Sequence, residues 1–192
     1  LMPNKIILKR KISNFHKKIS IPGDKSISIR WVLISSLANG ISKAKNLLMS
    51  EDVLATIKAI KKFGVKVIIK KDICIVHGVG INGYRYKKNL SINAENSGTL
   101  GRLISGILID TPFPIKLIGD KSLSRRRDFR RVAEPLSKFG ASFHLHKNLN
   151  LPLVIRGSQK LKPIRFFENR GSAQCKSSVL FAGIKTEGKT II

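Results

Sequence analysis

The sequence repeats itself at a nearly constant spacing, and this repeat limits the possible folds more than any other feature. The segment AIKKFGVKVII (59–69) resembles PLSKFGASFHL (135–145), so that Phe63 corresponds to Phe139. The turn-then-helix signals recur at almost the same separation, from Lys25 to Gly98 and from Ser97 to Ser172. This period is too long for a solenoid and indicates a repeated supersecondary unit.

Each unit has the pattern of a strand, a loop, a helix, a strand, a helix and a β-rich hairpin. In the first unit we expect short strands at 6–8 and 18–21. A helix should follow the turn at Pro22–Gly23, with Ile27, Trp31 and Ile34 at helical spacing, and stop at Asn39–Gly40. The remaining elements expected are a helix from Ser50 to Gly64, a hairpin of 65–69 with 73–76, a strand at 90–93 and a helix at 100–109. The third unit stops after one helix.

Composition excludes some classes of protein. With 42% hydrophobic residues spread over 192 positions, the chain can bury a core, and its longest uncharged apolar stretch (31–38) is too short to cross a bilayer. No secretory signal pattern opens the sequence, so we expect a cytoplasmic protein. Cys74 and Cys175 lack metal-type spacing, and His144 and His146 lack a third ligand, so we expect no metal site.

The net charge of +26, from 37 basic and 11 acidic residues, leaves two interpretations open. One is nucleic-acid binding through phosphate neutralisation, and the other is an enzyme that acts on small anions. Lysines occur in every segment, and only RRRDFRR (125–131) is a dense basic run. Aromatic residues, at 6%, do not alternate with basic residues as a platform for stacked bases requires. The charge alone favours neither interpretation.

Each unit also places Gly, Ser, Thr, Asn or Lys between a strand and a helix. A helix N-terminus has unpaired N–H groups and a partial positive charge, which together favour an anion. Lys25 adds a full charge there, and Arg30 follows within the first turns of the same helix. Alternatively, Ser26, Ser97 and Ser172 only cap their helices. Three such loops at one period favour a shared anion site over caps alone.

Four segments along the chain carry a family resemblance. They are PGDKSISIR (22–30), NAENSGTLGRLISG (93–106), GDKSLSRRR (119–127) and GSAQCKSSVLFAG (171–183). In this order and at this spacing they resemble the signature segments of 5-enolpyruvylshikimate-3-phosphate (EPSP) synthases. The related UDP-N-acetylglucosamine enolpyruvyl transferases are a poorer match, because their first loop usually has Ala and Asn where this chain has Asp24 and Ser26.

The resemblance implies an α/β (α+β) fold, an inside-out α/β barrel of repeated βαβαββ units with three units in each of two domains. Residues 1–20 would contribute a strand segment to the lower domain. Residues 21–192 would form most of the upper domain, with two complete repeats and an incomplete third. The family's enzymes are about twice as long, so the resemblance implies an N-terminal fragment. The complete form would be a monomer.

The reaction implied by the resemblance is enolpyruvyl transfer from phosphoenolpyruvate to the 5-hydroxyl of shikimate 3-phosphate, with release of phosphate. This is a step of the shikimate pathway toward chorismate and the aromatic amino acids. The resemblance implies no cofactor, no metal, no membrane and no nucleic-acid partner. The family's main acid–base groups lie outside these residues, so we expect this chain alone to be inactive.

The resemblance also assigns roles to ten residues. For shikimate 3-phosphate it implies contacts from Lys25, Ser26, Arg30, Ser172, Ala173 and Gln174. For phosphoenolpyruvate it implies contacts from Lys25, Asn96, Gly98, Thr99, Arg126 and Gln174. Lys25 is the catalytic residue among them. Both substrates carry a phosphate and a carboxylate, which require fixed cations and N–H dipoles.

Some residues depart from the family's pattern. Glu95 places a carboxylate beside an anion loop, and Arg127 stands where a proline is usual, which is expected to loosen the placement of Arg126. Gly98 predicts that glyphosate inhibits the complete enzyme, because resistant members often carry alanine there. The alternative to the enzyme is a non-enzymatic basic module that binds nucleic acid or anions.

Overall fold

Helices and strands alternate along the chain in the computed structural model, which describes residues 7, 9–11, 14, 16–146 and 150–192. The first unit consists of α1 (Lys25–Leu37), β1 (Asn39–Lys45), α2 (Glu51–Lys61), β2 (Lys66–Lys70) and β3 (Ile73–Val79). The second consists of β4 (Ser91–Asn93), α3 (Gly98–Ile107), the 3-10 turn η1 (Leu108–Asp110), β5 (Ile115–Ile118), α4 (Lys121–Arg126), α5 (Arg130–Ser137), β6 (Ser142–Leu145) and β7 (Leu153–Arg156). The third begins with α6 (Ala173–Ile184).

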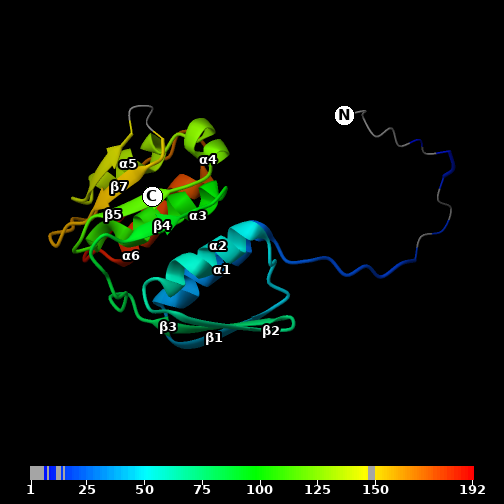
Figure 1. Cartoon of the computed structure of the whole chain (residues 1–192). Coiled ribbons are helices and arrows are strands. Elements are labelled where there is room, and N and C mark those ends of the chain that lie inside the picture. The colour runs from blue at the N-terminus through cyan, green and yellow to red at the C-terminus, as the bar shows by residue number, and fades with distance from the viewer. Residues whose placement is uncertain (1–6, 8, 12–13, 15, 147–149) are drawn as a thin grey trace.

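The order β1-β3-β2 of the first sheet recurs in the second sheet as β5-β7-β6, as the predicted repeat requires, and the second sheet has β4 in addition. The first sheet is ordered β1-β3-β2 and the second β4-β5-β7-β6 (Figure 1). In both sheets the hairpin strands pair antiparallel, with Val67 opposite Val76 in the first and Phe143 opposite Ile155 in the second. β4 pairs parallel to β5, and a parallel bridge of Arg165 with Ile191 repeats that arrangement around α6. The expected fold class is confirmed.

The helices pack in a regular alternation. α1, α3 and α6 each open a unit; α2 contacts both α1 and α3, and α5 contacts both α3 and α6. Between α6 and α1 lies an open groove of about 380 Å³, lined by Arg30, Ile34, Ser177, Leu180, Phe181 and Ile184. Elsewhere the buried side chains form one continuous core, which includes the equivalent Phe63 and Phe139.

Three expectations from the sequence concern segments at or near the N-terminus. The segment 18–21 is not a strand: it forms no ladder, and Ile19 and Ile21 are exposed, because no described strand lies beside it to pair with its backbone. The strand expected at 6–8 has both of its ends outside the described residues. In α1 the helix is confirmed, but Ile27 and Ile34 are exposed, since the core face carries Ile29, Val32 and Leu33 instead.

Candidate active site

The three helices that open the units begin with the same hydrogen bond. The N-cap side chain accepts a bond from the backbone N–H three residues later: Asp24 Oδ1 from Ile27 (2.7 Å), Ser97 Oγ from Leu100 (3.2 Å) and Ser172 Oγ from Cys175 (3.2 Å). The cap interpretation is therefore correct for Ser97 and Ser172, whereas in α1 the cap is Asp24 and not Ser26. Each cap satisfies one N–H, and other donors of the first turn stay available.

A pocket of about 340 Å³ lies where these N-termini meet. Its lining combines the starts of α1, α2, α3 and α6 with the end of α4: Lys25, Glu51, Asp52, Asn96, Gly98, Thr99, Arg102, Arg127 and Gln174. Five of the ten residues assigned from the sequence are therefore together here, namely Lys25, Asn96, Gly98, Thr99 and Gln174. The repeat explains the convergence, since equivalent loops of adjacent units lie at the same end of packed helices.

The other five residues lie outside this lining. Arg30 donates through Nε and Nη2 to Ser177 Oγ (3.1 and 3.0 Å) and through Nη1 to the Ser26 carbonyl (3.0 Å), so its guanidinium bridges α1 to α6. Ala173 accepts a bond from Ser177 Oγ through its carbonyl. Arg126 ends α4, and the neighbouring Arg127 lines the pocket in its place.

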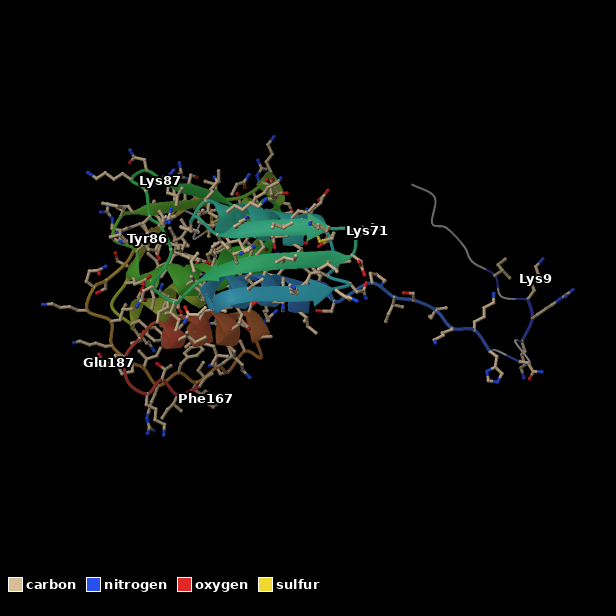
Figure 2. The ribbon with its side chains drawn as sticks, turned by 90° about the horizontal axis from the view of Figure 1, so that it is seen from below. Lys9, Lys71, Tyr86, Lys87, Phe167 and Glu187 are labelled. Atoms are coloured by element: carbon tan, nitrogen blue, oxygen red, sulfur yellow. The ribbon has the colours of Figure 1, made fainter. Side chains whose placement is uncertain are left out.

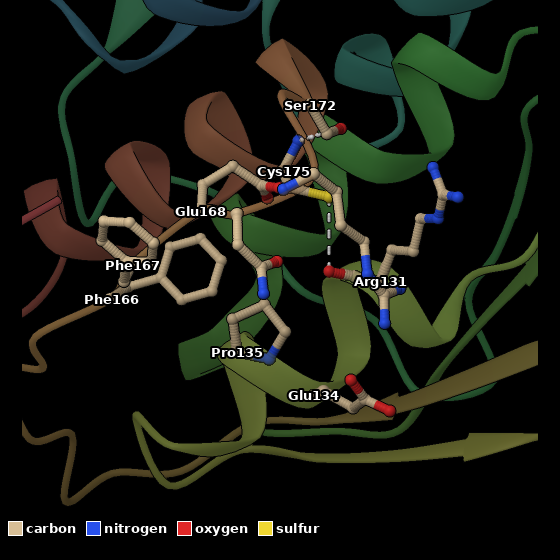
Figure 3. Close-up of a pocket in the computed structure, with 10 residues that line it drawn as sticks. Arg131, Glu134, Pro135, Phe166, Phe167, Glu168, Ser172 and Cys175 are labelled. Atoms are coloured by element: carbon tan, nitrogen blue, oxygen red, sulfur yellow. Dashed lines mark hydrogen bonds between the residues drawn. The ribbon is translucent and has the colours of Figure 1, made fainter.

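Ser172 lines a second hollow, of about 200 Å³, on another side of the α6 N-terminus (Figure 3). Cys175 also lines it and donates through Sγ to the Arg131 carbonyl (3.3 Å). Burial raises the pKa of the Cys175 thiol, which keeps it protonated near neutral pH. Glu134 and Glu168 balance Arg131 and Arg170 here, whereas the first pocket has three cations against two carboxylates, so this hollow is less suited to anions than the first.

Lys25 forms an ion pair with Asp52 across the pocket, with 3.4 Å between Nζ and Oδ2. Asp52 and Glu51 occupy the first turn of α2, where the helix dipole stabilises carboxylates. The Lys25 side chain is 51% exposed, so this pair adds little to the free energy of folding. Lys25 can therefore exchange Asp52 for a bound anion at small cost.

The motif GDKS occurs twice, and only one copy reaches the pocket. Asp120 caps α4 as Asp24 caps α1, accepting from Leu123 N–H (2.6 Å), but Lys121 does not line the pocket. The difference comes from the neighbours, because α1 starts beside α2 and Asp52 whereas α4 is a six-residue helix at the periphery. The chain thus contains its own control for Lys25.

Sequence reasoning missed Arg102, the most buried cation of the site. Its side chain donates through Nη1 to Gln174 Oε1 and through Nη2 to the Asp128 carbonyl (3.2 Å), and lies over the Phe129 ring at 5.6 Å. Burial lowers the pKa of the Arg102 guanidinium, which nevertheless stays charged at neutral pH. Helical spacing was the available signal, since Arg102 follows Gly98 and Thr99 by four and three residues.

Glu51, Asp52 and Arg127 were also missed as lining residues. The acidic pair was visible only as a helix start, and Arg127 only as a departure from the usual proline. Among the described residues, no group of three or more His, Cys, Asp or Glu is placed to hold a metal ion. In that same part of the chain, no helix has the length and apolar character needed to span a bilayer.

Basic side chains extend from widely separated parts of the surface, such as Lys9, Lys71 and Lys87 (Figure 2). The dense run is exposed at Arg125, Arg126 and Arg127, but its aromatic residue, Phe129, is fully buried. The positive charge is therefore spread over separate parts of the surface, and no stacking surface accompanies the dense run. Fold and site together define a repeated α/β protein with a pocket of charged and polar side chains at converging helix N-termini.

The chain belongs to the EPSP synthase (3-phosphoshikimate 1-carboxyvinyltransferase) family, whose model matches residues 9–192. It is 42% identical over 186 residues to the 3-phosphoshikimate 1-carboxyvinyltransferase of Streptococcus suis. This match covers 96% of this chain and 43% of that protein. The enzyme of the same name from a Sulfurihydrogenibium species is 43% identical over 184 residues, covering 95% of this chain and 42% of the relative.

A solved structure of EPSP synthase from Acinetobacter baumannii has the same fold, with a TM-score of 0.85 and 37% sequence identity. The match covers 91% of this chain and 39% of that one. The chain thus spans about two fifths of the length of the curated relatives and of this solved structure.

Proposed function

We propose that this chain supplies one half of the active site of an enzyme that transfers the enolpyruvyl group of phosphoenolpyruvate to the 5-hydroxyl of shikimate 3-phosphate. The observation that carries the proposal is the convergence of Lys25, Thr99, Arg102 and Gln174 at three helix N-termini. Both substrates are polyanions, and the pocket lining has three cations, Lys25, Arg102 and Arg127, against the two carboxylates of Glu51 and Asp52, with several N–H donors beside them. Membership of the EPSP synthase family supports this substrate class.

The residues of this chain would bind and orient the substrates. Lys25 leaves Asp52 and pairs with an anionic group of either substrate, while the backbone around Gly98 approaches phosphoenolpyruvate closely. The 5-hydroxyl attacks C2 of phosphoenolpyruvate as C3 takes a proton, and phosphate then leaves. The groups that move these protons would come from the part of the relatives that this chain does not match.

Five residues assigned from the sequence lie outside the pocket lining, and the proposal gives them a place at its edge. Ser26 and Arg30 lie in the first two turns of α1, and Ser172 and Ala173 are the N-cap and the first residue of α6; the starts of both helices border the pocket. Binding of the phosphate of shikimate 3-phosphate there would require Arg30 to exchange Ser177 for the ligand. Arg126 would likewise turn toward phosphoenolpyruvate beside Arg127.

We propose that residues 1–20 belong to a second domain and that residues 21–192 form the domain described above. We also propose that the complete protein is a cytoplasmic monomer. Sedimentation of the complete protein tests the monomer, since a dimer of twice the mass would contradict it.

Turnover is tested by replacing the matching part of the Streptococcus suis enzyme with residues 9–192 of this chain. We expect phosphate release from phosphoenolpyruvate only when shikimate 3-phosphate is present, and its loss in the chimera carrying Lys25→Ala. The matched control Lys121→Ala should retain the activity. A folded chimera that releases no phosphate, or releases it without shikimate 3-phosphate, would contradict the proposal.

The non-enzymatic alternative rests on the exposed arginines at 125–127. It predicts tight binding to DNA or RNA with a steep salt dependence that shikimate 3-phosphate does not relieve. Binding to a labelled duplex at low and high salt, with and without shikimate 3-phosphate, separates the two functions. Affinity that shikimate 3-phosphate leaves unchanged would favour the alternative.

A further inference from the structure

The side-chain amide of Gln174 has one orientation that satisfies its neighbours. An arginine has donors and no acceptor, so the atom that faces Arg102 Nη1 must be the amide oxygen, Oε1. The amide nitrogen then donates to Thr99 Oγ1 at 2.9 Å. Since Nε2 carries two hydrogens, one N–H remains after the bond to Thr99, and Gln174 lines the anion pocket.

We propose that Arg102 is a positioning residue that holds the Gln174 amide so that it offers an N–H donor, and not its carbonyl oxygen, to an anion in the pocket. This proposal rests on the proposed function, because it concerns binding of the anionic substrates. With Arg102 removed, the amide can rotate by half a turn about its last bond. The oxygen would then repel the anion that the N–H attracts.

The surroundings of Arg102 fix it in this role. Arg102 is only 9% exposed, its Nη2 donates to the Asp128 carbonyl, and its guanidinium lies over the Phe129 ring. Phe129 can approach only because position 101 is glycine: a Cβ at Gly101 would lie 2.9 Å from the ring atom Cζ. Ser178 Oγ also donates to the Arg102 carbonyl at 2.7 Å, which joins α6 to the same turn of α3.

Comparison of the three helix starts shows that this arrangement is specific to α3. Five positions after the N-cap, α1 has the fully buried Ile29 and α6 has Ser177, whereas α3 has Arg102. Ile29 shows that an apolar side chain at this position is sufficient for packing, so packing alone does not require an arginine at position 102. The buried Nε of Arg102 also lacks a hydrogen-bond partner, which is a cost that packing alone does not explain.

The orientation is measured directly on this chain by nitrogen-15 NMR of the Gln174 side-chain amide, compared with Arg102→Met and Arg102→Lys. Methionine has a similar length without the donors, and its flexible side chain fills irregular spaces in a core. We expect the Gln174 NH₂ protons of the parent chain to have shifts displaced from those of a solvent-exposed glutamine amide and to exchange slowly with solvent. Both features should be lost in Arg102→Met and partly recovered in Arg102→Lys. Unchanged Gln174 signals in a folded Arg102→Met variant would overturn the proposal.

Binding provides a second readout, with shikimate 3-phosphate as the probe. We expect Arg102→Met to weaken its binding about tenfold in the parent chain, but less than about twofold when Gln174 is already alanine. If Arg102 contacts the anion itself, the two losses multiply, which would contradict a role through Gln174. Absence of shikimate 3-phosphate binding by the parent chain would count against the proposed function, while the NMR measurement still decides the role of Arg102.

Discussion

The first and second repeat units share a scaffold and differ in the residues placed on it. Both open with a capped helix and end with an antiparallel hairpin in equivalent sheets. The second unit has the additional strand β4, and its second helix is divided into α4 and α5 around residues 127–129. That division brings Phe129 against α3, where Arg102 replaces the apolar Ile29 of α1. The repeat thus supplies the position of the site, and departures from the repeat supply part of its chemistry.

The largest expected effect concerns the equivalent phenylalanines that anchor the two units. Phe63 and Phe139 are both fully buried, so each change to alanine should lower the free energy of unfolding by about 3–5 kcal/mol. Phe63 also stacks on Tyr84 with centroids 4.7 Å apart and contacts Tyr86, which adds about 0.5–1.5 kcal/mol. Urea denaturation should therefore give a lower free energy of unfolding for Phe63→Ala than for Phe139→Ala. The opposite ranking would show that the second unit carries more of the stability.

The two GDKS motifs give the second comparison. Lys25→Ala should weaken shikimate 3-phosphate binding at least about tenfold, because a charged hydrogen bond is lost, whereas Lys121→Ala should leave binding within about twofold. Neither change should alter the free energy of unfolding by more than about 1 kcal/mol, since the pair of Lys25 with Asp52 is exposed. Calorimetric titration measures this difference. Equal losses in both variants would indicate general attraction by the positive charge.

Two glycines in α3 sharpen the contrast between scaffold and site. A Cβ at Gly101 would lie 2.9 Å from Phe129, so Gly101→Ala should cost about 1–3 kcal/mol in thermal or urea unfolding. At Gly98 the nearest atom to an added Cβ is 3.5 Å away, at Leu123, so Gly98→Ala should keep or slightly raise the stability. Its effect should instead be on glyphosate, with weaker inhibition of an active chimera. A large loss of stability in Gly98→Ala would contradict the packing described for the α3 N-terminus.

The smallest expected effect is an alkaline sensitivity from the tyrosines that follow the first unit. Burial raises the pKa of the phenols of Tyr84 and Tyr86, so the folded state keeps protons that the unfolded state loses above about pH 10. The stabilisation they contribute is complete below that pH and decreases as the pH rises further. Unfolding between pH 8 and 11 should show a shallower decline in Tyr84→Phe than in the parent chain. If stability declines equally with pH in Tyr84→Phe and in the parent chain, the alkaline sensitivity does not come from Tyr84.

The fold was largely predictable because its signals are local. Cap residues, glycine stops and apolar spacing identified α2, the first hairpin and the order of elements. The prediction of a strand at 18–21 was wrong, because the apolar spacing shows only that this segment is suited to a sheet. No described strand lies beside the segment to pair with it. In α1 the alternatives Ile27 and Ile29 are equally apolar, and only packing between helices decides which of them is buried.

The site was half predictable for a related reason. Lys25, Gly98 and Gln174 lie one or two residues after the caps, so the loop pattern locates them. Arg102 lies one turn further, and its role depends on contacts with Gln174 and Asp128, which are 72 and 26 residues away in sequence. The exchange of Arg126 for Arg127 in the pocket lining depends on where α4 ends, which is a boundary that local pattern does not determine.

The central claim is that the starts of α1, α3 and α6 form one site for a doubly anionic metabolite. It is tested most directly by following the backbone amide signals of this chain during titration with shikimate 3-phosphate. The account predicts saturable shifts at Lys25, Gly98, Thr99 and Gln174 together, with one dissociation constant. Shifts confined to the hollow around Arg131 and Arg170, or no saturable shifts at all, would contradict it.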